Sequence, residues 1–149
     1  MRNTKETELP STPIPARFRA QVHEIDHGLC AYCHTPEALT VTTFEIDHIM
    51  PVSQAGETRL DNLCLSCPSC NRHKGARQTI SDPETGENTP LYHPRHQVWS
   101  EHFYWNDDRT RLEGSTPVGR ATVSALHINR PQMIRLRGLW IKMGLFPPS

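Results

Sequence analysis

Hydrophobic residues in the first half of the chain follow two different spacings. In residues 17–27 they recur every three to four positions, which predicts a short amphipathic helix. Residues 39–49, with the sequence LTVTTFEIDHI, are rich in β-branched side chains and predict a strand. Residues 62–67 lead from an apolar run into a tight turn, and we expect a helix to start within residues 71–80. These short elements of both kinds indicate an α+β fold.

The second half of the chain has weaker periodicity but contains turn and cap signals. Residues 103–116 predict a hairpin, because two apolar segments flank an Asn-Asp-Asp turn. Thr116 is expected to cap a helix whose first residue is proline. Asn129 is expected to cap the last helix, where a proline follows two residues later. The second half should therefore add a hairpin and short helices to the first.

The chain of 149 residues is expected to form one domain with appended segments. Residues 1–16 contain three prolines among polar residues and predict a flexible N-terminal segment. Residues 17–80 hold the clearest helix and strand patterns and are expected to form the core. Residues 81–90 are rich in turn-forming residues and are interpreted as a linker. Residues 91–149 are expected to pack on this core as an extension.

The composition predicts an intracellular domain whose apolar core needs additional stabilisation. Only 36% of the residues are hydrophobic, so the apolar core must be modest. No apolar run approaches the ~20 residues of a membrane span, and the first ten residues resemble no secretory signal. We therefore expect a cytoplasmic protein with no membrane partner. Paired cysteines in such a reducing compartment are typical of metal sites.

The formal net charge of zero hides an uneven distribution. Residues 1–108 carry 9 Lys and Arg against 15 Asp and Glu, a net charge of −6. Residues 109–149 carry 7 basic residues and one acidic residue, a net charge of +6. A basic half can hold a polyanion such as nucleic acid. The alternative is that the basic half pairs with the acidic half of the same chain.

Two cysteine pairs with identical spacing predict a zinc site. Cys30 and Cys33 form one Cys-x-x-Cys pair, and Cys67 and Cys70 form the other. Tetrahedral zinc takes four such thiolates, and the ion would be structural because no ligand position stays open. Four merely buried or redox-active cysteines explain two identical spacings poorly. Cys64 lies in an apolar run and is interpreted as a buried free thiol, although it could replace Cys70 as a ligand.

An ordered set of motifs surrounds these cysteines. The chain carries in turn the first cysteine pair, EIDHIMP, DNL, and CPSCNRHK, which together span about residues 28–77. This set resembles the HNH endonuclease family in its cysteine-framed form. The resemblance implies a ββα-metal fold, in which two antiparallel strands and a helix hold one divalent ion. It also implies hydrolysis of phosphodiester bonds, usually in DNA, and double-stranded DNA is the expected partner.

The resemblance assigns roles to the polar residues between the cysteine pairs. His48 is the expected general base, because a neutral imidazole accepts a proton near pH 7. Asp47 is expected to bind the catalytic ion, since a carboxylate suits a hard cation such as Mg²⁺ or Mn²⁺. Asn62 is expected to orient the base and to close the intervening loop. Asp47 and His48 point to opposite faces of a regular strand, so reaching one ion requires the strand to lose regularity there.

The second ligand of the ion departs from the pattern in the family name. Many members have His directly after the last cysteine, whereas this chain has Asn71. We assign Asn71 as the ligand, with His73 as its rival, because its amide oxygen favours Mg²⁺ or Mn²⁺ over zinc. Lys74 lies one turn further and is expected to reach phosphate. The other candidate phosphate contacts, which are solvated helix faces in the alternative interpretation, are Arg120, Arg135 and Arg137.

Three functions are compatible with these features. The first is a metal-dependent nuclease with catalytic His48 and Asn62. The second is a non-catalytic zinc module that binds nucleic acid, which would not need Asp47, His48 and Asn62 together. The third is a protein-interaction module in which the two charged halves pair internally. The sequence leaves open the base specificity, nicking against double-strand cleavage, and the oligomeric state.

Overall fold

The computed structural model describes residues 13–148, so most of the predicted flexible segment 1–16 lies outside the described residues. The chain forms an α+β fold, as its sequence predicts. Its α-helices are α2 (Ala16–Ile25), α3 (Pro68–Lys74), α4 (Pro117–Ala125) and α5 (Pro131–Lys142). Its strands form three antiparallel pairs: β1 (Glu45–His48) with β2 (Leu63–Ser66), β3 (Thr79–Ser81) with β4 (Asn88–Pro90), and β5 (Phe103–Trp105) with β6 (Leu112–Gly114).

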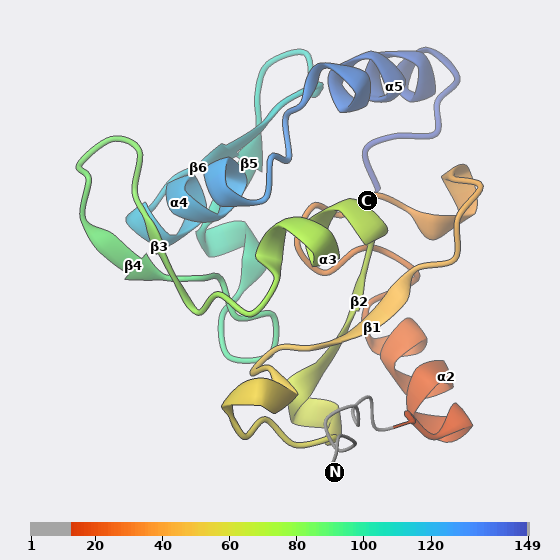
Figure 1. Cartoon of the computed structure of the whole chain (residues 1–149). Helices are drawn as coiled ribbons and strands as arrows, with labels where there is room; N and C mark the ends of the chain where they lie inside the picture. The colour runs from red at the N-terminus through yellow and green to blue at the C-terminus, as the bar shows by residue number, and fades with distance from the viewer. Residues whose placement is uncertain (1–12, 149) are drawn as a thin grey trace, which may run out of the picture.

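The centre of the molecule is a ββα unit made of β1, β2 and α3 (Figure 1). The register pairs Asp47 with Cys64 and His48 with Leu63, so β1 stays regular to its last residue. Every residue of β2 is buried, whereas in β1 only Asp47 is buried. Strand β2 therefore lies deeper in the core than β1. Helix α2 packs against β2.

The two halves of the chain share one apolar core. Tyr32 and Leu63 from the first half are fully buried together with Leu112 and Leu126 from the second. A buried ion pair also joins the halves: Arg95 donates two hydrogen bonds of 2.8 and 2.9 Å to Asp26 at the end of α2. The extension is therefore packed against the ββα unit by both apolar and polar contacts.

Several predicted elements agree with the structure. The first helix, α2, begins one residue before the predicted range and ends within it, and the predicted hairpin is β5–β6. Thr116 caps α4, where its hydroxyl accepts a 3.0 Å hydrogen bond from the Gly119 amide. Residues 81–90, interpreted as a linker, instead supply the end of β3, the turn and the second strand of the β3–β4 hairpin. Within residues 13–148, no helix has the length and apolar character needed to cross a membrane.

The strand predicted for residues 39–49 is too long. Only Glu45–His48 is strand, because the Glu37 carboxylate accepts the Phe44 amide at 2.7 Å and holds the preceding residues in a loop. The Thr40 hydroxyl bonds to the Glu37 carbonyl and strengthens that loop. A local side-chain contact thus replaces ladder pairing.

Asn129 does not cap the last helix. The residue at the N-cap of α5 is Arg130, which offers no capping side chain. The Asn129 amide instead bonds both backbone groups of Leu112, accepting at 2.9 Å and donating at 2.8 Å. The side chain therefore ties the segment before α5 to strand β6.

The ion pair between Asp26 and Arg95 gives a stability prediction. We expect Asp26→Ala to lower the free energy of unfolding by about 3–5 kcal/mol, because it leaves the Arg95 charge buried without a partner. Urea unfolding followed by circular dichroism measures this. The control is Glu57→Ala, which breaks the exposed pair with Arg59 and should cost at most about 1 kcal/mol. Equal losses in both variants would contradict the predicted role.

Candidate functional site

The four predicted cysteines converge into one buried cluster. The sulfur atoms of Cys30, Cys33, Cys67 and Cys70 all lie within 4.8 Å of one another. The first pair lies in the turn after α2, and the second pair spans the start of α3. The Cys67 sulfur caps that helix by accepting the Cys70 amide at 3.4 Å. The sequence therefore places both halves of the cluster by local turns.

The geometry of this cluster fits zinc. Tetrahedral coordination at about 2.3 Å per Zn–S bond separates the sulfurs by roughly 3.8 Å. The Cys33 and Cys67 sulfurs are 3.9 Å apart. Hydrogen bonding from Cys30 lowers the pKa of Cys33, while burial raises the pKa of Cys30. The four sulfurs are thus close enough to share negative thiolate charge through hydrogen bonds. A bound divalent ion would neutralise that charge.

Cys64 lies outside the cluster, as the sequence predicts. Its sulfur is 4.0 Å from a carboxylate oxygen of Asp47 and is fully buried. Burial raises the pKa of the Cys64 thiol, so it remains protonated. It behaves as a small apolar residue on the strand that pairs with β1.

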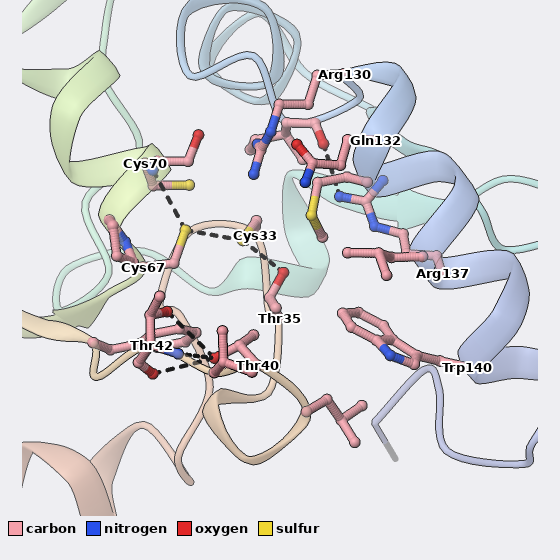
Figure 2. A pocket seen from close by; sticks show the side chains of 18 of the residues that line it. Cys33, Thr35, Thr40, Thr42, Cys67, Cys70, Arg130, Gln132, Arg137 and Trp140 are labelled. Carbon is pink, nitrogen blue, oxygen red and sulfur yellow. Dashed lines mark hydrogen bonds between the residues drawn. The ribbon is translucent and has the colours of Figure 1, made fainter.

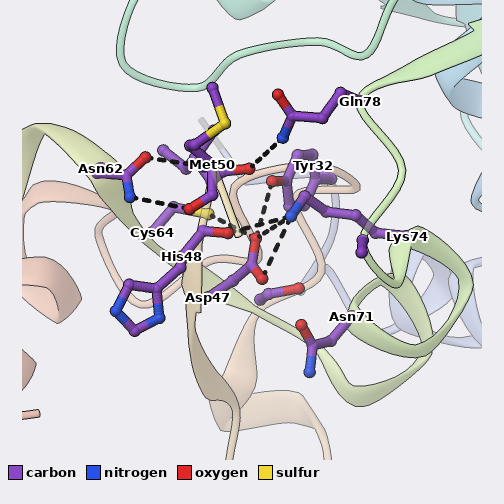
Figure 3. A network of polar contacts seen from close by, with 12 residues as sticks. Tyr32, Asp47, His48, Met50, Asn62, Cys64, Asn71, Lys74 and Gln78 are labelled. Atoms are coloured by element: carbon purple, nitrogen blue, oxygen red, sulfur yellow. Dashed lines mark hydrogen bonds and ion pairs between the residues drawn. The ribbon is translucent and has the colours of Figure 1, made fainter. Parts of the chain in front are cut away.

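Asp47 lies at the centre of a buried polar network (Figure 3). The Lys74 ammonium lies 3.1 Å from its Oδ2 atom, and the Tyr32 hydroxyl donates to the same oxygen at 3.1 Å. The Oδ1 atom has only a long 3.5 Å contact with Lys74. Burial raises the pKa of Asp47, and the Lys74 charge opposes that effect. One carboxylate oxygen therefore keeps the capacity to bind an ion.

Lys74 occupies a different environment from the one predicted. Its side chain is 1% exposed, and its ammonium also donates to the His48 carbonyl at 3.1 Å. A buried lysine with these partners does not support the predicted phosphate contact. Its charge instead compensates Asp47 inside the domain.

His48 points away from Asp47 and Asn71 in Figure 3. Its Nε2 atom lies 2.9 Å from the Thr58 hydroxyl, in the loop between β1 and β2. Burial lowers the pKa of His48, which favours the neutral imidazole. Because β1 is regular through His48, the predicted loss of strand regularity is absent from this structure. Within the described residues, no strand pairs with the other edge of β1.

Asn62 closes the loop rather than bonding the imidazole. Its amide accepts the Met50 amide at 2.8 Å and donates to the Met50 carbonyl at 3.1 Å. A third bond of 2.9 Å reaches the Glu57 carbonyl. Thr58 directly follows Glu57 in the chain. The bond from Asn62 to Glu57 therefore positions the Thr58 hydroxyl that contacts His48.

Asn71 and His73 lie in different surroundings on α3. The Asn71 amide nitrogen donates to Glu45, the first residue of β1. The His73 ring instead bonds the Ser69 carbonyl at 2.9 Å and packs against His127. Of these two residues it is therefore Asn71 that contacts β1, the strand carrying Asp47. Figure 3 shows its amide on the far side of Asp47 from His48.

The predicted arginine contacts divide into two groups. Arg120 donates two hydrogen bonds to buried Asp82, and Arg137 is fully buried and bonds the Ile128 and Thr110 carbonyls. These two side chains hold the fold and are not placed to receive DNA. Arg135 is exposed on α5.

Thr58, Tyr32 and Glu45 contact the candidate residues but were not singled out from the sequence. Glu45 begins the EIDHIMP motif and Thr58 lies between this motif and DNL, but both residue types suit many surface positions. Tyr32 lies between the first two cysteines, and an aromatic residue there is equally typical of a core. Their contacts depend on the packing of β1 against α3.

Zinc content can be tested with matched cysteine variants. The purified chain is expected to hold one zinc ion, and Cys30→Ala and Cys70→Ala should lose it because three thiolates leave the site incomplete. Cys64→Ala is the control and should retain zinc. Atomic emission measures the metal, and circular dichroism follows unfolding on chelation. Retention of zinc by Cys30→Ala would exclude the proposed ligand set.

Comparison with known proteins agrees with this geometry. A family model described as HNH endonuclease matches residues 30–77. No curated protein and no solved structure matches the chain. The matched segment contains both cysteine pairs, β1, β2 and α3, which are the parts that build the candidate site. Residues 30–77 of this chain are therefore similar to the HNH endonuclease family, and they contain a cysteine cluster suited to zinc.

Proposed function

We propose that this chain is a metal-dependent endonuclease that hydrolyses phosphodiester bonds in DNA. The observation that carries the proposal is the placement of Asp47 and Asn71. One lies on β1, and the other lies on α3 and contacts β1 through Glu45. The cysteine cluster fixes the start of α3 and thereby its position against the strand.

The donor atoms at this position suit a hard divalent cation. The Asp47 carboxylate and the Asn71 amide supply oxygen ligands, and the Glu45 carboxylate bonded to Asn71 adds negative charge. Oxygen donors of this kind favour Mg²⁺ or Mn²⁺ over zinc. When bound, such an ion would neutralise charge that develops on the phosphate during hydrolysis. Zinc in the cysteine cluster would have a structural role only.

Lys74 and Tyr32 keep the Asp47 carboxylate ionised and oriented. Burial alone would favour the protonated acid, which is a poor metal ligand. The Lys74 ammonium opposes this effect, and the Tyr32 hydroxyl fixes one oxygen. Lys74 is therefore a positioning residue, which differs from the phosphate contact that the sequence suggested.

His48 supplies the general base. If its Nε2–H donates to the Thr58 hydroxyl, its Nδ1 atom remains free to accept a proton from water. Burial lowers the pKa of His48, so this neutral form is available at neutral pH. The imidazole turns across the open edge of β1 towards the phosphate when substrate binds, since catalytic contacts often tighten only in the complex.

DNA is the proposed substrate, and the duplex form is part of the proposal. The exposed arginines Arg72 and Arg135 lie on α3 and α5, outside the internal ion pairs. One catalytic centre cuts one strand at a time, so a single chain should nick supercoiled DNA before it linearises it.

A second candidate function is a non-catalytic zinc module that binds nucleic acid. The specific observation in its favour is that Asp47 is bonded to Lys74 and Tyr32 while His48 bonds Thr58. A module of this kind would hold these contacts permanently. Binding of DNA without cleavage in any divalent metal would favour it.

Cleavage of supercoiled plasmid tests the nuclease. We expect nicked product with Mg²⁺ or Mn²⁺, no product in EDTA, and a loss of at least about 100-fold in His48→Ala, because a general base contributes roughly 10²–10⁴-fold. His96→Ala is the control, since His96 is exposed and outside the site. Gel densitometry measures the rates. Equal cleavage by His48→Ala and the wild type would exclude the assigned base.

The contact between Thr58 and His48 gives a separate prediction. Thr58→Val should slow cleavage roughly tenfold by removing the partner that fixes the imidazole, while Thr58→Ser should restore most of the rate. Because burial lowers the pKa of His48, the acid limb of the rate profile should lie below the ordinary histidine value of about 6.5. Rates measured from pH 4.5 to 8 test both statements, and an unchanged profile in Thr58→Val would contradict the first.

A further inference from the structure

A cavity of about 480 Å³ separates α5 from the cysteine cluster and the loop before β1 (Figure 2). The cysteine pairs and the start of α3 form one side, and residues 39–44 form another. Helix α5 closes the third side with Gln132, Arg137 and Trp140. This volume is within the usual range for a bound small molecule. The cavity is distinct from the network around Asp47, because none of its lining residues belongs to that network.

The polar side of the cavity is basic. Arg72, Arg130 and Arg137 line it, and no Asp or Glu is among the lining residues. Arg137 is fully buried, and its Nε atom has no hydrogen-bond partner. Within residues 13–148, the Arg130 guanidinium makes one long hydrogen bond, 3.4 Å to the His127 carbonyl. Three guanidinium groups beside one cavity are a typical arrangement for an anion.

The nearby thiolates do not cancel this charge. A zinc ion bound by four thiolates has two negative charges, and three of these cysteines line the cavity. The three guanidinium groups therefore leave the cavity one charge positive. Figure 2 shows Arg137 on α5, across the cavity from the labelled cysteines.

The opposite side of the cavity is apolar and contains an aromatic ring. Trp140 projects from α5 into the space in Figure 2, with Leu39 and Phe44 among the lining residues. An inorganic anion would leave this apolar surface unused. A planar base attached to a phosphate would use both sides. Any of the bases can stack on an aromatic side chain, because each has a flat π-face.

The cavity is continuous in sequence with the candidate catalytic residues. Phe44 lines it and directly precedes Glu45, and Arg72 lines it and directly follows Asn71. Phe44 and Asp47 are three residues apart, which is roughly 10 Å along a strand. This separation spans only a few nucleotides of a DNA strand. A strand cleaved at Asp47 would therefore reach the cavity.

We propose that this cavity binds one unpaired nucleotide of the DNA strand, with its phosphate on Arg72 and Arg130 and its base against Trp140. The nucleotide must be unpaired, because a base stacked in a duplex cannot enter an enclosed space. The inference rests on the proposed function for the identity of the substrate. It adds a subsite that recognises a flanking nucleotide near a nick, a bulge or a single-stranded segment.

Binding without cleavage tests the subsite. The zinc-loaded full chain carrying His48→Ala is titrated, without added divalent metal, into fluorescein-labelled oligothymidylate. We expect Arg72→Gln and Arg130→Gln each to weaken binding roughly five- to tenfold by anisotropy. Arg19→Gln is the matched control: Arg19 is an exposed helical arginine outside the cavity and should change affinity less than twofold. Tryptophan fluorescence should be quenched on binding, and Trp140→Phe should remove most of that quenching.

Three outcomes would overturn the subsite. Affinities of Arg72→Gln and Arg130→Gln equal to that of Arg19→Gln would exclude the phosphate contact. Equal quenching in Trp140→Phe would exclude the base contact. An equal loss of affinity for a blunt duplex in Arg72→Gln and Arg130→Gln would exclude the unpaired nucleotide. Plasmid cleavage by the unmodified chain separates this result from the nuclease proposal, since either can fail while the other holds.

Discussion

The position of α3 against β1 depends on the convergence of two cysteine pairs. One pair follows α2 and the other begins α3, so a metal bound by all four joins segments that are far apart in sequence. Metal binding of this kind contributes about 10–16 kcal/mol of folding free energy in small zinc domains. A chain with a modest apolar core depends on that contribution. The same convergence sets the distance between Asn71 and the strand that carries Asp47.

The second constraint is the buried charge of Asp47. A carboxylate in this position costs free energy unless a partner compensates it, and Lys74 is that partner. Because the lysine comes from α3, the ion pair links the helix to β1 next to the candidate ligands. The ion pair stabilises the packed ββα unit, and in the proposed function it would also keep an ionised oxygen ligand available. Removing either charge would therefore affect both properties.

The cysteine cluster could be predicted from local spacing, and the ββα order from the resemblance to the HNH family. The environments of Lys74 and Thr58 could not, since each depends on a contact made after distant segments pack. In the sequence, Lys74 cannot be distinguished from a solvent-exposed lysine, because it is buried only by the packing of α3 against β1. The contact of Thr58 with His48 requires Asn62 to close the loop first. The overlong strand prediction failed for a similar reason, because one Glu37 side chain replaced the expected backbone pairing.

The basic second half of the chain shows why net charge alone is a weak guide to DNA contacts. Arg120 of the basic half is bonded to Asp82 of the acidic half, so part of the charge asymmetry is resolved inside the molecule. This supports the alternative that acidic and basic segments pair internally, at least for these two residues. Arg72 and Arg130 lie outside such pairs and beside the cysteine cluster, where no carboxylate lines the cavity. Recognition of a polyanion should therefore depend on where unpaired arginines meet a cavity, and much less on the total charge of the extension.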